Sequence, residues 1–125
     1  MILFRPEHVQ PILDGTKTQT RRLGSKRWRV GAIHQARTHM FKPETTFANL
    51  EILEVREERL TDISDADVRA EGYDDREAFI RAFCRINNLW IVWKHEMVWV
   101  IKFRLVDTVE SLTVMLRRQT QCSSE

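Results

Sequence analysis

The sequence predicts one α+β domain, a small and mostly β mixed barrel with short flanking helices. At 125 residues, the chain is long enough for one hydrophobic core, because domains commonly span about 100 to 150 residues. Apolar residues alternate with polar ones in several stretches, which indicates strands, and short amphipathic stretches between them indicate helices. Strands and helices do not alternate regularly, and this argues against a doubly wound parallel sheet.

The N-terminal elements are a short strand, a helix and a polar extended segment. Residues 2–4 are apolar enough for a strand. Pro6 suits the first position of a helix that ends at Gly15, while Pro11 kinks this helix or limits its regular part to a turn or two. Residues 16–22 are polar and β-branched, so we expect a strand or extended segment lining a hydrated space.

Three further strands are predicted. Val30-Gly31 predicts a turn into a strand over 32–37. The apolar residues of 47–60 alternate in two phases, which indicates one long strand with a β-bulge. The most regular alternation covers 97–106. The side chains predicted on one side of this last strand are Met97, Trp99, Ile101, Phe103 and Leu105.

Two short helices are predicted before the last strand. Ser64 and Asp67 have the pattern of an N-cap followed by a first-turn acid, and Gly72 ends this helix. Asp74 and Glu77 repeat the pattern for a second helix, which ends at Asn87-Asn88. We interpret its apolar residues as core rather than as a ligand-binding cluster. These residues are Phe79, Ile80, Phe83 and Ile86.

The composition indicates a folded, soluble and cytoplasmic protein. Apolar residues make up 42% and charged residues 30%, and no apolar stretch approaches the roughly 20 residues that cross a bilayer. Cys84 and Cys122 show no paired spacing, so we expect reduced thiols. The domain covers residues 1–106, and 107–125 form a partly disordered C-terminal extension.

Charge is distributed unevenly along the chain. Between Lys17 and Lys42 there are eight basic residues and no acid, whereas residues 51–77 contain eleven acids and four arginines. The acidic run suits a solvated surface. The basic run includes Trp28, and cations around an aromatic ring suit phosphate contact with base stacking. The predicted RNA-binding residues are Lys26, Arg27, Arg29 and Arg37.

The densest group of polar side chains lies between Gly15 and Arg22. A partly buried Lys17 has a lowered pKa and can activate the hydroxyl of Thr20 as a nucleophile. In an uninterrupted strand these two residues point to opposite faces, so Lys17 must lie on the loop before a strand that begins at Thr18. Thr20 and Arg22 then share a face, with Arg22 as an anion clamp. A polar structural or binding segment is the alternative interpretation.

Hydrolysis also needs an acid or base to protonate the leaving group. Glu71 is the candidate, because it lies at the C-terminal end of a predicted helix, where the helix dipole disfavours an acid. An exposed helical glutamate is the simpler alternative. The four histidines show no metal-binding spacing, so no metal and no cofactor are predicted.

With these residues, the sequence resembles the ASCH domain family of the PUA-like superfamily, whose signature is GxKxxTxR after the first helix. The motif is formed by Gly15, Lys17, Thr20 and Arg22, and the resemblance extends over about residues 2–106. The resemblance implies a PUA-like β-barrel with flanking helices. It also implies a cleft that binds RNA or nucleotides and contains the signature residues.

One branch of small bacterial ASCH proteins hydrolyses the acetyl amide of acetylcytidine with a lysine, a threonine and a glutamate. By resemblance these catalytic residues are Lys17, Thr20 and Glu71. Other branches resemble a ribonuclease or bind RNA without chemistry, so the partner is RNA or a modified nucleoside. This chain departs from the acetylcytidine branch in its greater length, in the basic pair Arg21-Arg22 after the threonine, and in Ala32 after the turn glycine. The predicted substrate-binding residues are Gly15, Thr18, Arg21, Arg22 and Trp28.

Overall fold

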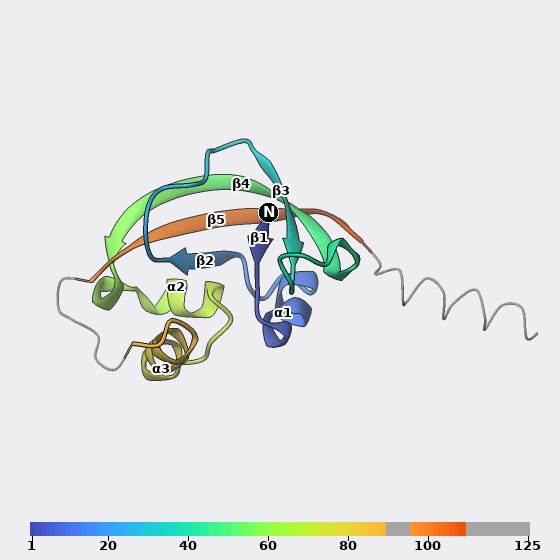
Figure 1. The fold of residues 1–125 in the computed structure, drawn as a ribbon. Coiled ribbons are helices and arrows are strands. Elements are labelled where there is room, and N and C mark those ends of the chain that lie inside the picture. The colour runs from blue at the N-terminus through green and yellow to red at the C-terminus, as the bar shows by residue number, and fades with distance from the viewer. Residues whose placement is uncertain (90–95, 110–125) are drawn as a thin grey trace, which may run out of the picture.

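The computed structural model describes residues 1–89 and 96–109, in which five strands form one curled sheet (Figure 1). Three single-turn 3-10 helices, η1 to η3, accompany the strands and α-helices. The elements are β1 (Ile2–Leu3), η1 (Pro6–His8), α1 (Val9–Leu13), β2 (Gln19–Arg22), β3 (Ile33–Arg37), η2 (Pro43–Thr45), β4 (Thr46–Arg59), η3 (Leu60–Asp62), α2 (Asp65–Ala70), α3 (Arg76–Ile86) and β5 (Met97–Thr108).

The sheet has the order β1-β3-β4-β5-β2, with β1 and β2 at its edges. The pair β1–β3 is parallel and the other pairs are antiparallel. In Figure 1, the long strands β4 and β5 arch over the helices, with α2 and α3 beneath one end of the arch. The predicted mixed barrel is thus confirmed as a half-barrel. Its two edge strands, β1 and β2, are the first two strands of the chain.

The bulge predicted for residues 47–60 is present in β4. The pairing with β5 shifts between Ile52 and Glu54, and Leu53 between them is 42% exposed. The extra residue explains why the apolar pattern changes phase there, since a bulge reverses the faces of all later side chains. A bulged strand bends and twists, and this supports the curl of the sheet.

Two clusters of buried side chains make up the core, and β5 contributes to both. Ile101 and Phe103 belong to the cluster inside the curl, together with α1 and β4. Val98 and Val100 face the other way, into a cluster with α2 and α3. The alternation predicted for β5 therefore holds from Trp99 to Leu105, but the opposite face is also apolar near its start, where the helices cover it. Met97, expected on the inner side, is 42% exposed.

Helix ends follow the predicted signals, with one correction. Ser64 caps α2, its hydroxyl accepting the Asp67 N–H at 3.1 Å, as expected. The N-cap of α3 is Asp75 and not Asp74, since the Asp75 carboxylate accepts the Ala78 N–H at 2.8 Å. The first helix is a 3-10 turn followed by the five residues of α1, in agreement with the limit set by Pro11.

Other predictions fall partly outside the described residues. β5 continues to Thr108, two residues beyond the predicted domain boundary. Cys84 forms no disulfide with a described residue, while Cys122 and most of the predicted extension lie outside the described ranges. Within residues 1–89 and 96–109, no helix has the length and apolar character needed to cross a membrane.

Candidate functional site

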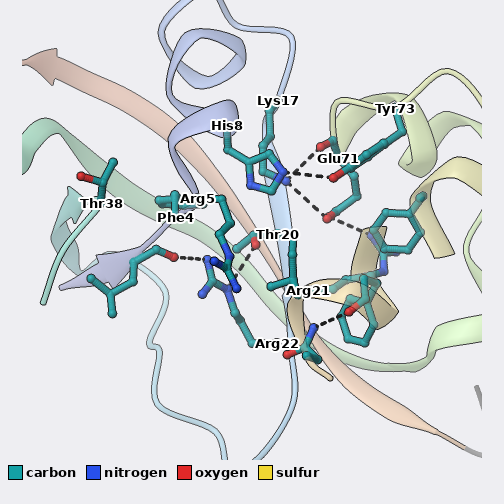
Figure 2. Close-up of a pocket in the computed structure, with 15 residues that line it drawn as sticks. Phe4, Arg5, His8, Lys17, Thr20, Arg21, Arg22, Thr38, Glu71 and Tyr73 are labelled. Carbon is teal, nitrogen blue, oxygen red and sulfur yellow. Dashed lines mark hydrogen bonds and ion pairs between the residues drawn. The ribbon is translucent and has the colours of Figure 1, made fainter. Parts of the chain in front are cut away.

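A cavity of about 320 Å³ opens between the N-terminal segment, β2 and the two helices α2 and α3 (Figure 2). It lies where the two core clusters meet, so one of its walls is apolar. Fifteen residues line it: Leu3, Phe4, Arg5, His8, Lys17, Thr20, Arg21, Arg22, Thr38, Glu71, Tyr73, Phe79, Phe83, Ile86 and Asn87. The structure thus brings together the three residues predicted to be catalytic. Glu71 lies 54 positions after Lys17 in the sequence, and Thr20 lies close to Lys17.

Lys17 lies on the loop between α1 and β2, as the strand geometry requires, and β2 begins at Gln19 rather than Thr18. Backbone hydrogen bonds hold this loop against the end of α2. The Lys17 N–H donates to Pro11 O at 2.9 Å, and the Thr18 N–H donates to Ala70 O at 2.7 Å. The Lys17 ammonium group is therefore directed at the C-terminal end of α2 and away from solvent.

Glu71 is the C-cap of α2 and is 2% exposed, as is Lys17. The next residue, Gly72, has a φ of 95°, and its N–H and that of Tyr73 bond back to Arg69 O and Val68 O. This is a Schellman motif, which requires a left-handed residue and hence favours glycine. The turn directs the Glu71 side chain into the cavity.

Lys17 and Glu71 form a buried pair. The Lys17 Nζ donates to the Glu71 carbonyl oxygen at 2.9 Å and lies 3.5 Å from Glu71 Oε1. Burial lowers the pKa of the Lys17 amine and raises the pKa of the Glu71 carboxyl, because a poorly hydrated site disfavours both charged forms. A general base and a general acid need pKa values that move in these directions.

Thr20 and Arg22 lie on the same face of β2, as predicted. Arg22 Nε donates to Thr20 Oγ1 at 3.2 Å, and Arg22 Nη2 donates to Leu3 O at 2.6 Å. The guanidinium also stacks on Phe4, with its central carbon 5.1 Å from the ring centroid. Burial lowers the pKa of Arg22 to about 10. Among the described residues, the Thr20 hydroxyl is held by Arg22, and no hydrogen bond joins it to Lys17.

Arg21 points to the opposite side of β2, toward carboxylates. Its Nη1 donates to Glu71 Oε2 at 3.0 Å, and its Nη2 donates to Glu58 Oε1 at 3.0 Å and to Asp67 Oδ2 at 3.1 Å. The side chain is fully buried. Both oxygens of Glu71 are therefore engaged, one with Lys17 and one with Arg21. This second contact fixes the orientation of the carboxylate.

His8 and Tyr73 are cavity residues that the sequence pattern did not single out. The His8 Nε2 lies 3.1 Å from the Tyr73 hydroxyl, and the tyrosine ring packs edge-on against Phe79. Burial and the nearby charge of Lys17 lower the pKa of His8 to about 4, so the imidazole is neutral near pH 7. The only available signal was that Tyr73, the one tyrosine of the chain, follows the glycine after Glu71.

The other residues predicted to bind substrate or RNA do not line the cavity. Gly15 and Thr18 lie on the loop around Lys17, and Trp28 packs against the core cluster inside the curl. Arg37 donates to Thr46 Oγ1 at 3.0 Å. Phe79 and Phe83, interpreted as core, are buried and also form part of the cavity wall. The exposed basic residues of the β2–β3 connection are Lys26, Arg27 and Arg29.

The site contains no evident place for a metal ion. Within the described part of the chain, no three His, Cys, Asp or Glu side chains come together as metal ligands would. The cavity instead combines an amine, a carboxyl group, a hydroxyl and a neutral imidazole–phenol pair. A hydroxyl beside a buried amine and a carboxyl group suits nucleophilic attack on a carbonyl carbon, followed by proton transfer to the leaving group.

Comparisons with known proteins bear on the fold. The sequence matches no protein-family model and no curated protein. Several solved structures are similar. A protein of Enterococcus faecalis V583, described by the family model DUF984, superposes with a TM-score of 0.63 at 17% identity, covering 82% of this chain and 72% of that one.

Two structures described as ASCH proteins also match. The ASCH domain from Lactobacillus crispatus JV V101 has a TM-score of 0.57 at 20% identity and covers 78% of this chain and 69% of its own. ASCH from Zymomonas mobilis has a TM-score of 0.59 at 11% identity and covers 87% and 71%. At these identities the likeness concerns the arrangement of strands and helices. The chain therefore has the fold of ASCH domains, as its GxKxxTxR resemblance predicts.

Proposed function

We propose that this protein is an amidohydrolase that removes the acyl group from a modified nucleoside such as N4-acetylcytidine. The observation that carries the proposal is the convergence of Lys17, Thr20 and Glu71 on one cavity, with Lys17 and Glu71 buried against each other. Lysine and glutamate are rarely buried unless they are paired, and here each is 2% exposed. Buried ionisable groups with shifted pKa values are concentrated at functional sites.

In the proposed reaction, a proton first shifts within the buried pair from Lys17 to Glu71. Thr20 Oγ1 then attacks the carbonyl carbon of the acyl group while its proton passes to the Lys17 amine. The bond between the carbonyl carbon and the cytidine nitrogen then breaks. The leaving nitrogen takes up a proton from Glu71, which recovers one from Lys17 at 3.5 Å. Water hydrolyses the resulting Thr20 ester, releasing the carboxylic acid. All atoms of substrate and water appear in the two products.

The reaction requires Thr20 to exchange one hydrogen bond for another. In the structure its hydroxyl accepts from Arg22 Nε, whereas the reaction needs it to donate to Lys17. Threonine rotates between staggered side-chain positions, and catalytic hydrogen bonds often form only when the substrate is bound. Substrate that occupies the cavity and attracts Arg22 would release the hydroxyl for this change.

The size of the cavity favours a small substrate. Pockets for small molecules commonly measure about 300 to 1,000 Å³, and the 320 Å³ found here is at the lower end of that range. The wall formed by Phe4, Phe79 and Phe83 provides apolar surface for a planar base. Both features suit one nucleoside unit.

The direct test is to incubate the protein with N4-acetylcytidine and to follow cytidine and acetate by chromatography. We expect turnover by the wild type and a loss of at least about 10³-fold in kcat for Lys17→Ala and Thr20→Ala. Matched controls are Lys26→Ala and Thr16→Ala, which change exposed residues outside the cavity. Mass spectrometry of rapidly quenched samples should detect the acyl group on Thr20. Full activity in both cavity variants would exclude the proposed roles.

RNA binding is a second candidate, favoured by the β2–β3 connection. Lys26, Arg27 and Arg29 are exposed there around the partly buried Trp28, and none forms an ion pair with a described residue. Phosphate contacts by these side chains predict that log K falls linearly with log salt, with a slope of about −0.7 per contact for single strands. Fluorescence anisotropy with a labelled RNA measures this slope. Gel analysis of the same RNA tests the ribonuclease alternative.

A further inference from the structure

The charges that line the cavity do not balance. Four cationic side chains face it, Arg5, Lys17, Arg21 and Arg22, but Glu71 is the only carboxylate among the lining residues that the structure describes. A partly buried cation without a counter-charge is unfavourable, because desolvation is not repaid by an ion pair. Ion pairs within the protein compensate only part of this positive charge.

Two of the four cations are matched within the protein. Lys17 lies 3.5 Å from one oxygen of Glu71, and Arg21 donates to the other at 3.0 Å. Arg21 also reaches Glu58 and Asp67 at 3.0 and 3.1 Å. The charges of both residues are therefore compensated within the protein, and both terminal nitrogens of Arg21 already donate to carboxylates.

Arg22 has no carboxylate partner among the described residues. It forms no ion pair with any carboxylate in residues 1–89 and 96–109. Its Nε and Nη2 donate to neutral oxygens of Thr20 and Leu3, and Nη1 has no hydrogen bond to a described group. The guanidinium packs over Phe4 and lines the cavity. One of its nitrogens is thus available to an anion inside the cavity.

Arg5 lies beside this group. The hydrogen bond from Arg22 to Leu3 O, at 2.6 Å, joins β2 to the segment that carries Arg5. Arg5 is exposed and, like Arg22, has no ion pair with a described residue. Figure 2 shows both arginines near Thr20, whereas Tyr73 lies across the cavity beside Glu71. The two unmatched positive charges are therefore on one side of the cavity.

We propose that Arg22 and Arg5 form a phosphate subsite, and that the preferred substrate is an acylated nucleoside monophosphate rather than the free nucleoside. This inference rests on the proposed amidohydrolase function and specifies its substrate. A phosphate monoester carries a charge of about −1.5 to −2 at pH 7, which matches two guanidinium groups. Arginine also binds phosphate oxygens through paired N–H groups.

A phosphate group can belong to a mononucleotide or to an RNA strand. The cavity volume of about 320 Å³ favours the mononucleotide, because it accommodates about one nucleoside unit. The basic residues of the β2–β3 connection, which would contact a longer strand, do not line the cavity. A mononucleotide also places its charge in the cavity while its base lies against the aromatic wall.

The test compares kcat/KM for N4-acetylcytidine, its 5′- and 3′-monophosphates and a short acetylated RNA. We expect one monophosphate to exceed the nucleoside by about 10- to 100-fold, the factor typical of hydrogen bonds to charged groups. Arg5→Gln should reduce this ratio toward one. The matched control Arg69→Gln, which removes an exposed arginine outside the cavity lining, should leave the ratio unchanged. Equal values for nucleoside and monophosphates, or a ratio unaffected by Arg5→Gln, would overturn the inference.

Two further outcomes separate the inference from the function on which it rests. If the nucleoside and its monophosphates are hydrolysed with equal kcat/KM, the amidohydrolase function is supported and the phosphate subsite is excluded. If no compound is hydrolysed, the amidohydrolase fails, and calorimetry with cytidine 5′-monophosphate against cytidine decides whether the subsite exists. A higher kcat/KM for the RNA than for both monophosphates would assign the phosphate to a strand and contradict the mononucleotide.

Discussion

Arg21 is buried on β2 and forms ion pairs with three carboxylates. The sequence suggested contact with substrate, but the guanidinium is fully buried and meets Glu58, Asp67 and Glu71. Arg56 extends this network, donating to Asp67 Oδ2 at 2.8 Å. Because Arg21 holds one oxygen of Glu71, we expect it to position the carboxylate. Its role in substrate binding remains a prediction.

Replacing Arg21 with Met should destabilise the protein by about 3–5 kcal/mol, since it removes one partner of a buried ion pair and leaves Glu71 Oε2 without its hydrogen bond. Arg56→Met is the matched control on the same network, and because that side chain is 35% exposed we expect a loss of at most about 1 kcal/mol. Urea denaturation measures both values. Equal losses in the two variants would show that burial of Arg21 has no special importance.

His8 predicts a pH dependence of stability. Its pKa is about 4 in the folded protein and about 6.5 when unfolded, so between these values the unfolded chain binds more protons. The free energy of unfolding therefore falls as the pH decreases from 6.5 to 4. His8→Gln keeps a hydrogen-bonding group near Tyr73 but does not titrate, and its stability should depend less on pH in this interval. Urea denaturation at several pH values tests the difference; parallel profiles would contradict it.

At the level of elements, the turn that ends α2 determines the position of Glu71. Gly72 follows the C-cap with a φ of 95°, and a Cβ there would lie 3.5 Å from Lys17 Cβ. The turn is thus packed directly against the lysine with which Glu71 pairs. A local helix-ending signal, visible in the sequence, here places the side chain that we propose as the acid.

Gly72→Ala should destabilise the protein by about 1–2 kcal/mol, the cost of a left-handed conformation for a residue with a Cβ. Gly31→Ala is a matched control, because Gly31 has a φ of 89° and open space around it. We expect similar losses of stability in urea, but a reduced kcat on the acylated substrate only for Gly72→Ala. A loss of activity in both variants would indicate a general effect of destabilisation.

At the scale of the whole molecule, β5 joins the two core clusters. Its neighbouring residues Val100 and Ile101 are fully buried on opposite faces, one toward the helices and one inside the curl. β5 also pairs with β4 on one side and β2 on the other. The helices that supply Glu71 and the strand that supplies Thr20 are thus connected through one central strand.

This arrangement predicts that both clusters unfold together. Ile101→Ala should lower the free energy of unfolding by about 2–5 kcal/mol. Val98→Ala, in the helix-facing cluster, should lower it by a smaller amount because fewer methyl groups are removed. In both variants, urea transitions followed by far-UV and near-UV circular dichroism should coincide. Separate transitions for the two signals would show that the clusters are independent.

Features that depend on neighbouring residues could be predicted from the sequence alone. Alternation identified the strands, the two-phase pattern of 47–60 identified the bulge, and Ser64 and Gly72 marked the ends of α2. Strand parity placed Lys17 on the loop before β2. Where two adjacent acids competed as an N-cap, the local pattern selected Asp74, whereas the structure uses Asp75. Such signals are reliable because backbone geometry acts over only a few residues.

Contacts between groups that are far apart along the chain could be identified only in the folded protein. Lys17 and Glu71 are 54 positions apart, and His8 and Tyr73 are 65 apart, so no local pattern pairs them. The packing of helices on the sheet likewise buries both faces of β5. It also brings three carboxylates to Arg21. Burial and charge act through space rather than along the chain, and they set which amine loses its hydration and which arginine keeps a free nitrogen.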